Sequence, residues 1–130
     1  MYDAELLDRS GHPRFRGEIS GVKPITLVNS SCGDELLIYL KIEGMRVIDG
    51  RWQGAGCAIS LASADAFIED IIGKTLDEAT EMSEEFSQMI LGRKTEVEKL
   101  AAAKCLCSVS RMPARANCAK LAWKSLEKIA

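Results

Sequence analysis

The stretch PITLVNSSCGDELLIYLKIE, residues 24 to 43, decides the fold. It contains two runs of β-branched and aliphatic residues, which favour strands, separated by small and polar residues from Ser30 to Asp34. Gly44 marks the next turn, and residues 46 to 52 alternate as a third strand. Because short connections join antiparallel neighbours, the three strands are predicted to form an antiparallel meander.

Segments with a helical spacing of apolar residues flank this meander. They cover residues 2–8, 58–73, 75–91, 95–104 and 113–129. Thr75 followed by Glu78 is the pattern of a capping box, and Pro113 suits a first helical turn. Since strands come first and most helices follow, the sequence predicts an α+β fold, with a three-stranded antiparallel sheet packed against about four to five helices.

The composition indicates a soluble globular protein that forms a single domain over residues 1–130. Hydrophobic residues make up 47% of the chain and charged residues 28%, and no apolar run approaches the ~20 residues that a membrane-spanning helix needs. The net charge of -2 provides no broad positive field for phosphate backbones, so no nucleic-acid partner is expected. The N-terminal segment is acidic where a secretory signal is basic, so a cytoplasmic location is expected.

The cysteine content points to thiol or metal chemistry. The chain has five cysteines, an odd number, and a reducing cytosol keeps thiols free. They are Cys32, Cys57, Cys105, Cys107 and Cys118. A disulfide framework is therefore not expected.

Three of these cysteines stand where a ligand is expected. Cys32 lies in the turn between two strands, two positions before Asp34, so its thiol and the carboxylate can converge on one ion. Cys57 follows Gly-Ala-Gly and precedes a helix, whose N-terminus stabilises a thiolate. Cys118 lies on the apolar stripe of the last helix, and Arg115, one turn earlier, is placed to hold a negative sulfur. Three thiolates and one carboxylate match a tetrahedral zinc site, and thiolate-rich sites select zinc or iron-sulfur clusters.

The other candidate residues favour structural roles. Cys105 and Cys107 are two positions apart, which places them on different faces of a helix, so packing is predicted rather than ligation of one ion. His12, the only histidine, lies in a Gly-His-Pro loop and is predicted to be exposed. Trp123 is predicted to lie in the core or at its rim.

Three motifs give the chain a family resemblance. NSSCGD at 29–34, GAGCAIS at 54–60 and RANCAKLAW at 115–123 resemble, in this order, the three cysteine motifs of the U-type iron-sulfur cluster assembly proteins, which are IscU, SufU and the N-terminal domain of NifU. The segment Asp8 to Gly17 also resembles the N-terminal motif of that family. The resemblance covers nearly the whole chain.

Within this family the chain is most similar to the SufU branch. The interval between Cys57 and Cys118 resembles the longer interval of SufU proteins, which carry an insertion before the last cysteine. IscU proteins have a histidine just before that cysteine, where this chain has Asn117, and they have a Leu-Pro-Pro-Val-Lys chaperone-docking motif. The corresponding residues here, 111–115, read Arg-Met-Pro-Ala-Arg.

The resemblance implies a fold, a cofactor and partners. It implies a three-stranded sheet packed against helices and a zinc site formed by Cys32, Asp34, Cys57 and Cys118. In the SufU branch, the cysteine equivalent to Cys32 leaves the zinc and accepts persulfide sulfur from a SufS-like cysteine desulfurase, assisted by the arginine equivalent to Arg115. The protein is then a sulfurtransferase-like acceptor rather than a stand-alone enzyme, and iron-sulfur carriers or scaffold proteins act downstream of it.

Two other functions stay open from the residues. A scaffold could assemble a transient [2Fe-2S] cluster on Cys32, Cys57 and Cys118, because soft thiolates suit iron as well as zinc. Alternatively, zinc could serve only to hold the fold together. The sequence also departs from the family pattern, since Ser30 stands where a proline is usual and Arg9 where a histidine is usual.

Overall fold

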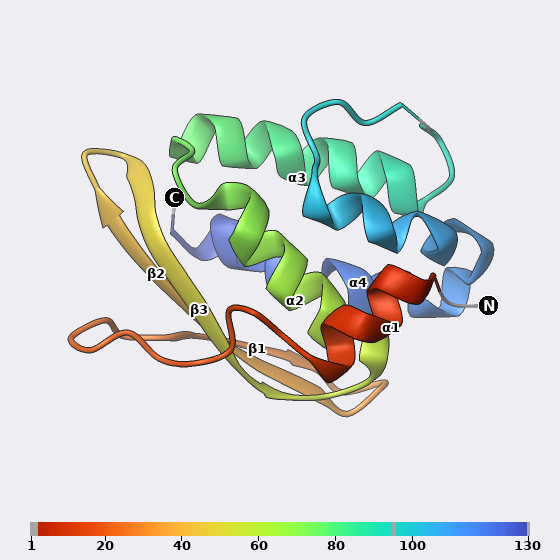
Figure 1. Ribbon diagram of the computed structural model, residues 1–130, viewed down its shortest axis with the longest axis horizontal. Helices are drawn as coiled ribbons and strands as arrows, with labels where there is room; N and C mark the ends of the chain where they lie inside the picture. Colours follow the sequence, from red (N-terminus) through yellow and green to blue (C-terminus); the bar gives the residue numbers. More distant parts are fainter. Residues whose placement is uncertain (1–2, 95, 130) are drawn as a thin grey trace.

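The strands form the antiparallel meander that the sequence predicts. The computed structural model describes residues 3–94 and 96–129. Its sheet has the order β1-β2-β3, with β1 (Ile25–Asn29), β2 (Asp34–Glu43) and β3 (Arg46–Ala55) connected by short turns (Figure 1). In the register, Asn29 lies opposite Asp34 and Glu35 lies opposite Ala55.

The sheet buries one face, and β2 shows why. Its buried residues Leu36, Ile38 and Leu40 alternate with outward-facing residues, as the two-residue period of a strand requires. Asp34, two positions before Leu36, lies on the same inward face and is 0% exposed. A carboxylate therefore occupies a core-facing position at the end of the sheet where the β1–β2 turn lies.

Helices cover the buried face of the sheet and complete an α+β fold. The first three are α1 (Ala4–Gly11), α2 (Ala58–Ile71) and α3 (Leu76–Ile90). The central helix α2 contacts β3 and α1, and it is buried along most of its length (Figure 1). The predicted capping box is present at the start of α3, where Thr75 and Glu78 bond each other's backbone N–H groups. In the part of the chain that the structure describes, we find no helix with the length and hydropathy needed to cross a membrane.

The C-terminal region forms consecutive short helices instead of the single helix expected over 113–129. They are η2 (Pro113–Arg115), α4 (Ala116–Lys120) and η3 (Ala122–Lys128), where η marks a 3₁₀ helix. Serine hydroxyls of α2 explain the break, because they donate hydrogen bonds to the carbonyl oxygens of residues 118 and 119, at 3.3 and 2.6 Å. Those two carbonyls are the acceptors that an uninterrupted α-helix would use.

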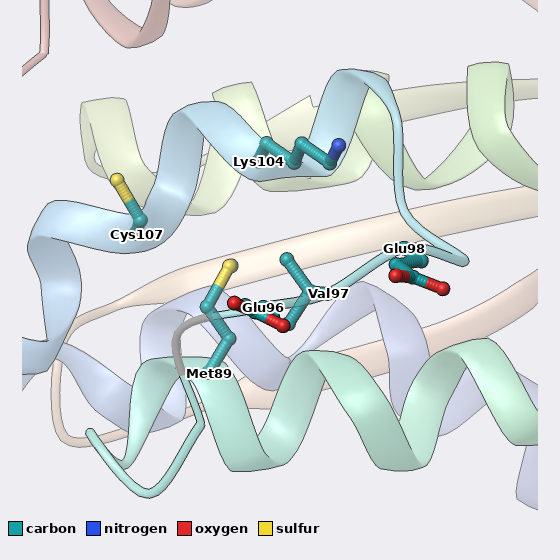
Figure 2. A pocket seen from close by; sticks show the side chains of 6 residues that line it. All are labelled: Met89, Glu96, Val97, Glu98, Lys104 and Cys107. Carbon is teal, nitrogen blue, oxygen red and sulfur yellow. The ribbon is translucent and has the colours of Figure 1, made fainter.

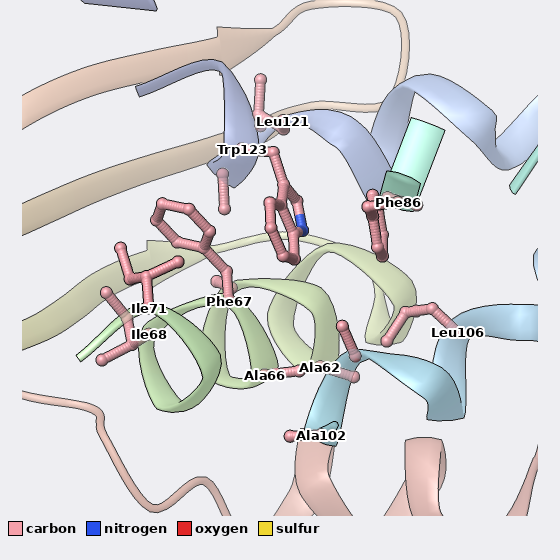
Figure 3. Packing of buried hydrophobic residues seen from close by; sticks show 14 of the residues in the cluster. Ala62, Ala66, Phe67, Ile68, Ile71, Phe86, Ala102, Leu106, Leu121 and Trp123 are labelled. Atoms are coloured by element: carbon pink, nitrogen blue, oxygen red, sulfur yellow. The ribbon is translucent and has the colours of Figure 1, made fainter. Parts of the chain in front are cut away.

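Aromatic packing fixes this C-terminal region against α2 and α3. Trp123 is 3% exposed, stacks on Phe86 with 4.5 Å between ring centroids, and meets the edge of Phe67 at 4.8 Å (Figure 3). Its indole N–H donates a hydrogen bond to Ser63 Oγ at 3.2 Å. The core position predicted for Trp123 is confirmed, and the helix carrying Cys118 is held in place from one side.

The segment expected to be helical over 95–104 differs in the structure. Its predicted first residue, Thr95, lies outside the described residues, and residues 96–101 form turns and irregular backbone. The 3₁₀ helix η1 (Ala102–Arg111) begins only afterwards, because the Asp70 carboxylate of α2 accepts hydrogen bonds from the backbone N–H groups of residues 101–103, at 2.7 to 3.1 Å. A side chain distant in sequence therefore sets this helix start.

The leader between α1 and β1 is tied to the core through Asp65. One oxygen of this buried carboxylate accepts hydrogen bonds from Phe15 N at 2.7 Å and Trp52 Nε1 at 2.9 Å, and the other pairs with the Arg9 guanidinium at 2.9 Å. Phe15 O in turn accepts a hydrogen bond from Trp52 N, and Arg16 forms an isolated bridge with Trp52 of β3. These contacts hold the leader against β3 and α2.

Candidate metal centre

The β1–β2 turn carries Cys32 to one end of the sheet. The loop between paired Asn29 and Asp34 has Gly33 at a φ of 72°, a left-handed conformation that glycine adopts at little cost. Cys32 N donates a hydrogen bond to Asn29 O at 3.2 Å, and the cysteine is partly exposed. Cys32 is therefore held by a short loop and can be reached from solvent.

Asp34 brings a negative group to the buried side of this turn. Its Oδ1 accepts a hydrogen bond from Cys57 N at 2.9 Å, whereas its Oδ2 is buried and has no hydrogen-bond partner among the described residues. Burying a carboxylate oxygen without a partner is costly, so a cation or a proton is needed there. The arrangement suits a ligand to a positive ion.

The Gly54-Ala-Gly56 sequence lets Cys57 approach Asp34. A Cβ on Gly56 would collide with Asp34 Oδ1, the atom that accepts the Cys57 N–H. A Cβ on Gly54 would collide with the backbone oxygen of Glu35 on the neighbouring strand, and Gly54 also has a φ of 137°. Gly54 is therefore required for the close approach of two strand backbones, and Gly56 makes room for the Asp34 side chain.

Cys118 completes a close group of three ligand atoms. Its Sγ lies 3.0 Å from Cys32 Sγ, and one ligand atom each of Cys32, Asp34 and Cys118 lie within 4.8 Å of one another. Cys118 is 0% exposed, on α4, and it faces the protein body as its apolar stripe predicts. Residues from a strand turn, a strand start and a C-terminal helix thus converge at one place.

Cys57 joins this group through its backbone N–H, which donates to Asp34, and its thiol is near enough to Cys118 to raise the pKa of that thiol. It is the N-cap of α2, and its Sγ lies 3.6 Å from Ser60 Oγ. Ser60 Oγ also donates a hydrogen bond to the Cys118 carbonyl at 3.3 Å, so Cys57 and Cys118 border the same buried hydroxyl. The sulfur of Cys57 is outside the group of atoms within 4.8 Å, and its role as a ligand stays a prediction.

The electrostatics of the centre also favour a cation. Burial raises the pKa of the Cys118 thiol, and the neighbouring Cys32 and Asp34 raise it further. Several sulfurs beside a buried carboxylate cannot all be ionised unless a positive charge offsets them. Thiolates with one carboxylate are a donor set typical of zinc or iron, and metal binding would release the thiol protons.

Arg115 lies at the end of η2, directly before the helix that carries Cys118. It is half-buried. Its predicted role, to hold a negative sulfur, stays a prediction. His12 is exposed, as predicted, and its Nδ1 lies 3.5 Å from Asp8 Oδ1.

Cys105 and Cys107 lie apart, as their spacing predicts. Cys105 is 5% exposed and Cys107 is exposed. Figure 2 shows the surroundings of Cys107, a cavity of about 350 Å³ that it lines together with Lys104 of η1, Met89 of α3 and the loop residues 96–98. None of the residues predicted as metal ligands lines this cavity.

Sequence reasoning missed the polar residues that support the cysteines. Asn29 Nδ2 donates a hydrogen bond to Cys118 Sγ at 3.6 Å, and Ser60 contacts both Cys57 and Cys118. A signal for Asn29 exists, because it is a polar residue at the end of a strand immediately before the cysteine turn. Ser60 lies one helical turn after Cys57, which is a weaker signal.

The fold and the cysteine arrangement define a known family. The family model described as NifU-like N-terminal domain matches residues 1–128, and the chain belongs to this family.

Individual relatives match over nearly the whole chain. It is 37% identical to a Thermotoga maritima protein named iron-sulfur cluster assembly scaffold protein IscU, over 98% of this chain and 91% of that protein. It is 36% identical to the zinc-dependent sulfurtransferase SufU of Bacillus subtilis, over 98% of this chain and 88% of that protein. The crystal structure of a SufU protein from Fervidobacterium islandicum AW-1 superposes with a TM-score of 0.90 at 38% identity, covering 98% of this chain and 94% of that one.

Proposed function

We propose that this protein acts in iron-sulfur cluster assembly as a zinc-binding acceptor of persulfide sulfur, and that Cys32 is the acceptor. The observation that supports this proposal most is the convergence of Cys32, Asp34 and Cys118 within 4.8 Å around a buried, unpartnered carboxylate oxygen. Relatives named as a zinc-dependent sulfurtransferase and as cluster assembly proteins support the same assignment. The proposal treats residues 1–130 as one assembly domain that works in the cytoplasm.

The proposed zinc ligands are Cys32, Asp34, Cys57 and Cys118. Zinc bound there would keep the cysteine sulfurs deprotonated at neutral pH. The fold positions two of these ligands. Asp34 is fixed by the hydrogen bond that it accepts from Cys57 N, and Cys118 is buried on a helix that packs against α2. Cys32 lies in a loop, is partly exposed, and is next to Asp34 and Cys118.

The sulfur transfer is an exchange at a persulfide. The Cys32 thiolate attacks the outer sulfur of a persulfide on the desulfurase, a new S–S bond forms on Cys32, and the S–S bond on the desulfurase breaks. The desulfurase cysteine leaves as a thiolate, so the exchange needs no external oxidant or reductant. Arg115, adjacent to the Cys118 helix, is proposed to hold the resulting negative persulfide until an iron-sulfur carrier or scaffold protein accepts the sulfur.

Peptide mass spectrometry tests where the sulfur goes. The protein is incubated with a cysteine desulfurase and cysteine, and each cysteine peptide is examined for added sulfur. The proposal expects persulfide on Cys32, loss of sulfur uptake in Cys32→Ser, and normal uptake in Cys107→Ser, which removes an exposed cysteine outside the centre. Sulfur uptake that survives Cys32→Ser would overturn the assignment of the acceptor.

A scaffold function is the second candidate, supported by the relative named as a scaffold protein and by the preference of iron for thiolates. In that case Cys32, Cys57 and Cys118 would hold a [2Fe-2S] cluster. Anaerobic reconstitution with iron and sulfide distinguishes the two candidates. A stable, stoichiometric cluster that displaces zinc would favour the scaffold, whereas retained zinc without a stable cluster favours the sulfur acceptor.

A further inference from the structure

Two sulfurs in the candidate centre lie close together but have different proposed roles, so their surroundings must distinguish them. Cys32 Sγ and Cys118 Sγ are 3.0 Å apart, and the proposed function assigns sulfur acceptance to only one of them. Burial contributes to the difference, because Cys118 is 0% exposed and Cys32 is partly exposed. Asn29 also distinguishes the two sulfurs, because its side chain donates a hydrogen bond to only one of them.

We propose that Asn29 is a positioning residue that selects Cys32 over Cys118 as the reacting sulfur. Its side-chain Nδ2 donates a hydrogen bond to Cys118 Sγ at 3.6 Å. Zinc at this site would leave neither sulfur with a proton, so no S–H hydrogen bond would join them and the Asn29 amide remains the donor that distinguishes Cys118. This inference rests on the proposed function, since it explains which sulfur takes part in it.

The position of Asn29 in the sheet makes it suited to this role. It is the last residue of β1 and pairs with Asp34 across the turn, and its backbone oxygen accepts the Cys32 N–H. One residue therefore contacts the turn that carries Cys32 through its backbone and the helix that carries Cys118 through its side chain. Because a strand backbone is fixed by its ladder, the amide is held at a constant place relative to both sulfurs.

An amide donor changes the reactivity of the sulfur that accepts it. A hydrogen bond to sulfur withdraws negative charge from it and must be broken or weakened before that sulfur can attack an electrophile. Cys118 receives this bond from Asn29, whereas the Asn29 side chain makes no such contact with Cys32 among the described residues. Asn29 thereby lowers the nucleophilicity of Cys118 and leaves Cys32 as the more reactive sulfur.

Site-resolved alkylation tests this inference without a desulfurase. The protein as purified is treated with iodoacetamide, and peptide mass spectrometry follows the modification rates of Cys32, Cys57 and Cys118. In Asn29→Ala the rate at Cys118 relative to Cys32 is expected to rise about 5- to 10-fold, the factor that corresponds to one lost hydrogen bond. Asn29→Leu keeps the approximate side-chain size but has neither an N–H donor nor a charge, and the same direction is expected.

Asn117→Ala is the matched control. Asn117 is exposed and directly precedes Cys118, and no hydrogen bond of its side chain is found within the described part of the chain. Its substitution should leave the ratio of the two rates unchanged.

Two outcomes would overturn the inference. An unchanged ratio in both Asn29 variants would show that burial alone separates the sulfurs. Equal acceleration at all three cysteines would show that Asn29 only stabilises the turn. Sulfur uptake by the wild type from a desulfurase is measured separately, so a wild type that takes up no sulfur refutes the proposed function and not the effect of Asn29.

Discussion

Replacing Gly56 with alanine should disrupt the candidate centre by displacing the Asp34 carboxylate. The added Cβ would collide with Asp34 Oδ1, which accepts the Cys57 N–H. Losing a hydrogen bond to a charged acceptor costs about 1.5–3 kcal/mol. Forcing an extra methyl group into a packed position costs a further ~1–3 kcal/mol. The free energy of unfolding should therefore fall by about 2.5–6 kcal/mol.

The assay separates folding from metal binding. Urea unfolding in the presence of a chelator gives the free energy of unfolding of the metal-free chain, and competition with a zinc indicator gives the zinc affinity. Displacing the Asp34 carboxylate should weaken zinc binding by about 10- to 100-fold, as loss of an orienting contact at a metal site does.

Gly11→Ala is the control, because a Cβ at Gly11 meets no atom within 4 Å and Gly11 ends a helix. If Gly56→Ala unfolds and binds zinc as Gly11→Ala does, the assigned contact between Gly56 and Asp34 is refuted.

Three further predictions concern parts of the molecule outside the centre. Arg9→Ala should lower the free energy of unfolding by about 3 kcal/mol in urea, because it leaves the buried charge of Asp65 without its cation, and a loss below about 1 kcal/mol would contradict the buried pair. Cys107 should react with iodoacetamide at pH 8 while Cys105 stays unmodified, since burial raises the pKa of Cys105 to about 12; equal labelling would refute the burial of Cys105. The hydrogen bond to the N-cap backbone of α3 lowers the pKa of Glu78 below its ordinary 4.5, so its charge stabilises the fold above that pH, and the contribution is lost as pH falls through the lowered value. The stability difference between wild type and Glu78→Gln should therefore shrink in acid, and a pH-independent difference would count against this.

Local sequence patterns predicted the elements that are stabilised by near neighbours. The β1–β2–β3 meander follows from alternation and short turns, and the start of α3 follows from the Thr75 capping box. The start of η1 could not be predicted in this way, because Asp70 sets it from a helix about 30 residues earlier in the chain. The leader likewise depends on Asp65, whose partners are far from it in sequence.

Three of the four predicted ligands, Cys32, Asp34 and Cys118, lie together in the structure, whereas the contacts around them were not predicted. The buried face that Asp34 occupies can be predicted from its spacing to Leu36, and the inward position of Cys118 can be predicted from its apolar stripe. The contact of Asn29 with Cys118 depends on how α4 packs against the end of β1, which no local pattern contains. The requirement for glycine at position 56 likewise depends on where the Asp34 side chain packs.

Metal content combined with desulfurase stimulation tests whether the protein is a zinc-binding acceptor of sulfur. Wild type and Cys32→Ser are purified without chelators, their zinc and iron are quantified, and each is added to a cysteine desulfurase. The wild type is expected to hold about one zinc per chain, as a single tetrahedral site does, and to stimulate the desulfurase. The stimulation is expected to be lost in Cys32→Ser although the variant stays folded. Zinc in both proteins with no effect on the desulfurase would contradict sulfur acceptance and leave zinc a purely structural role.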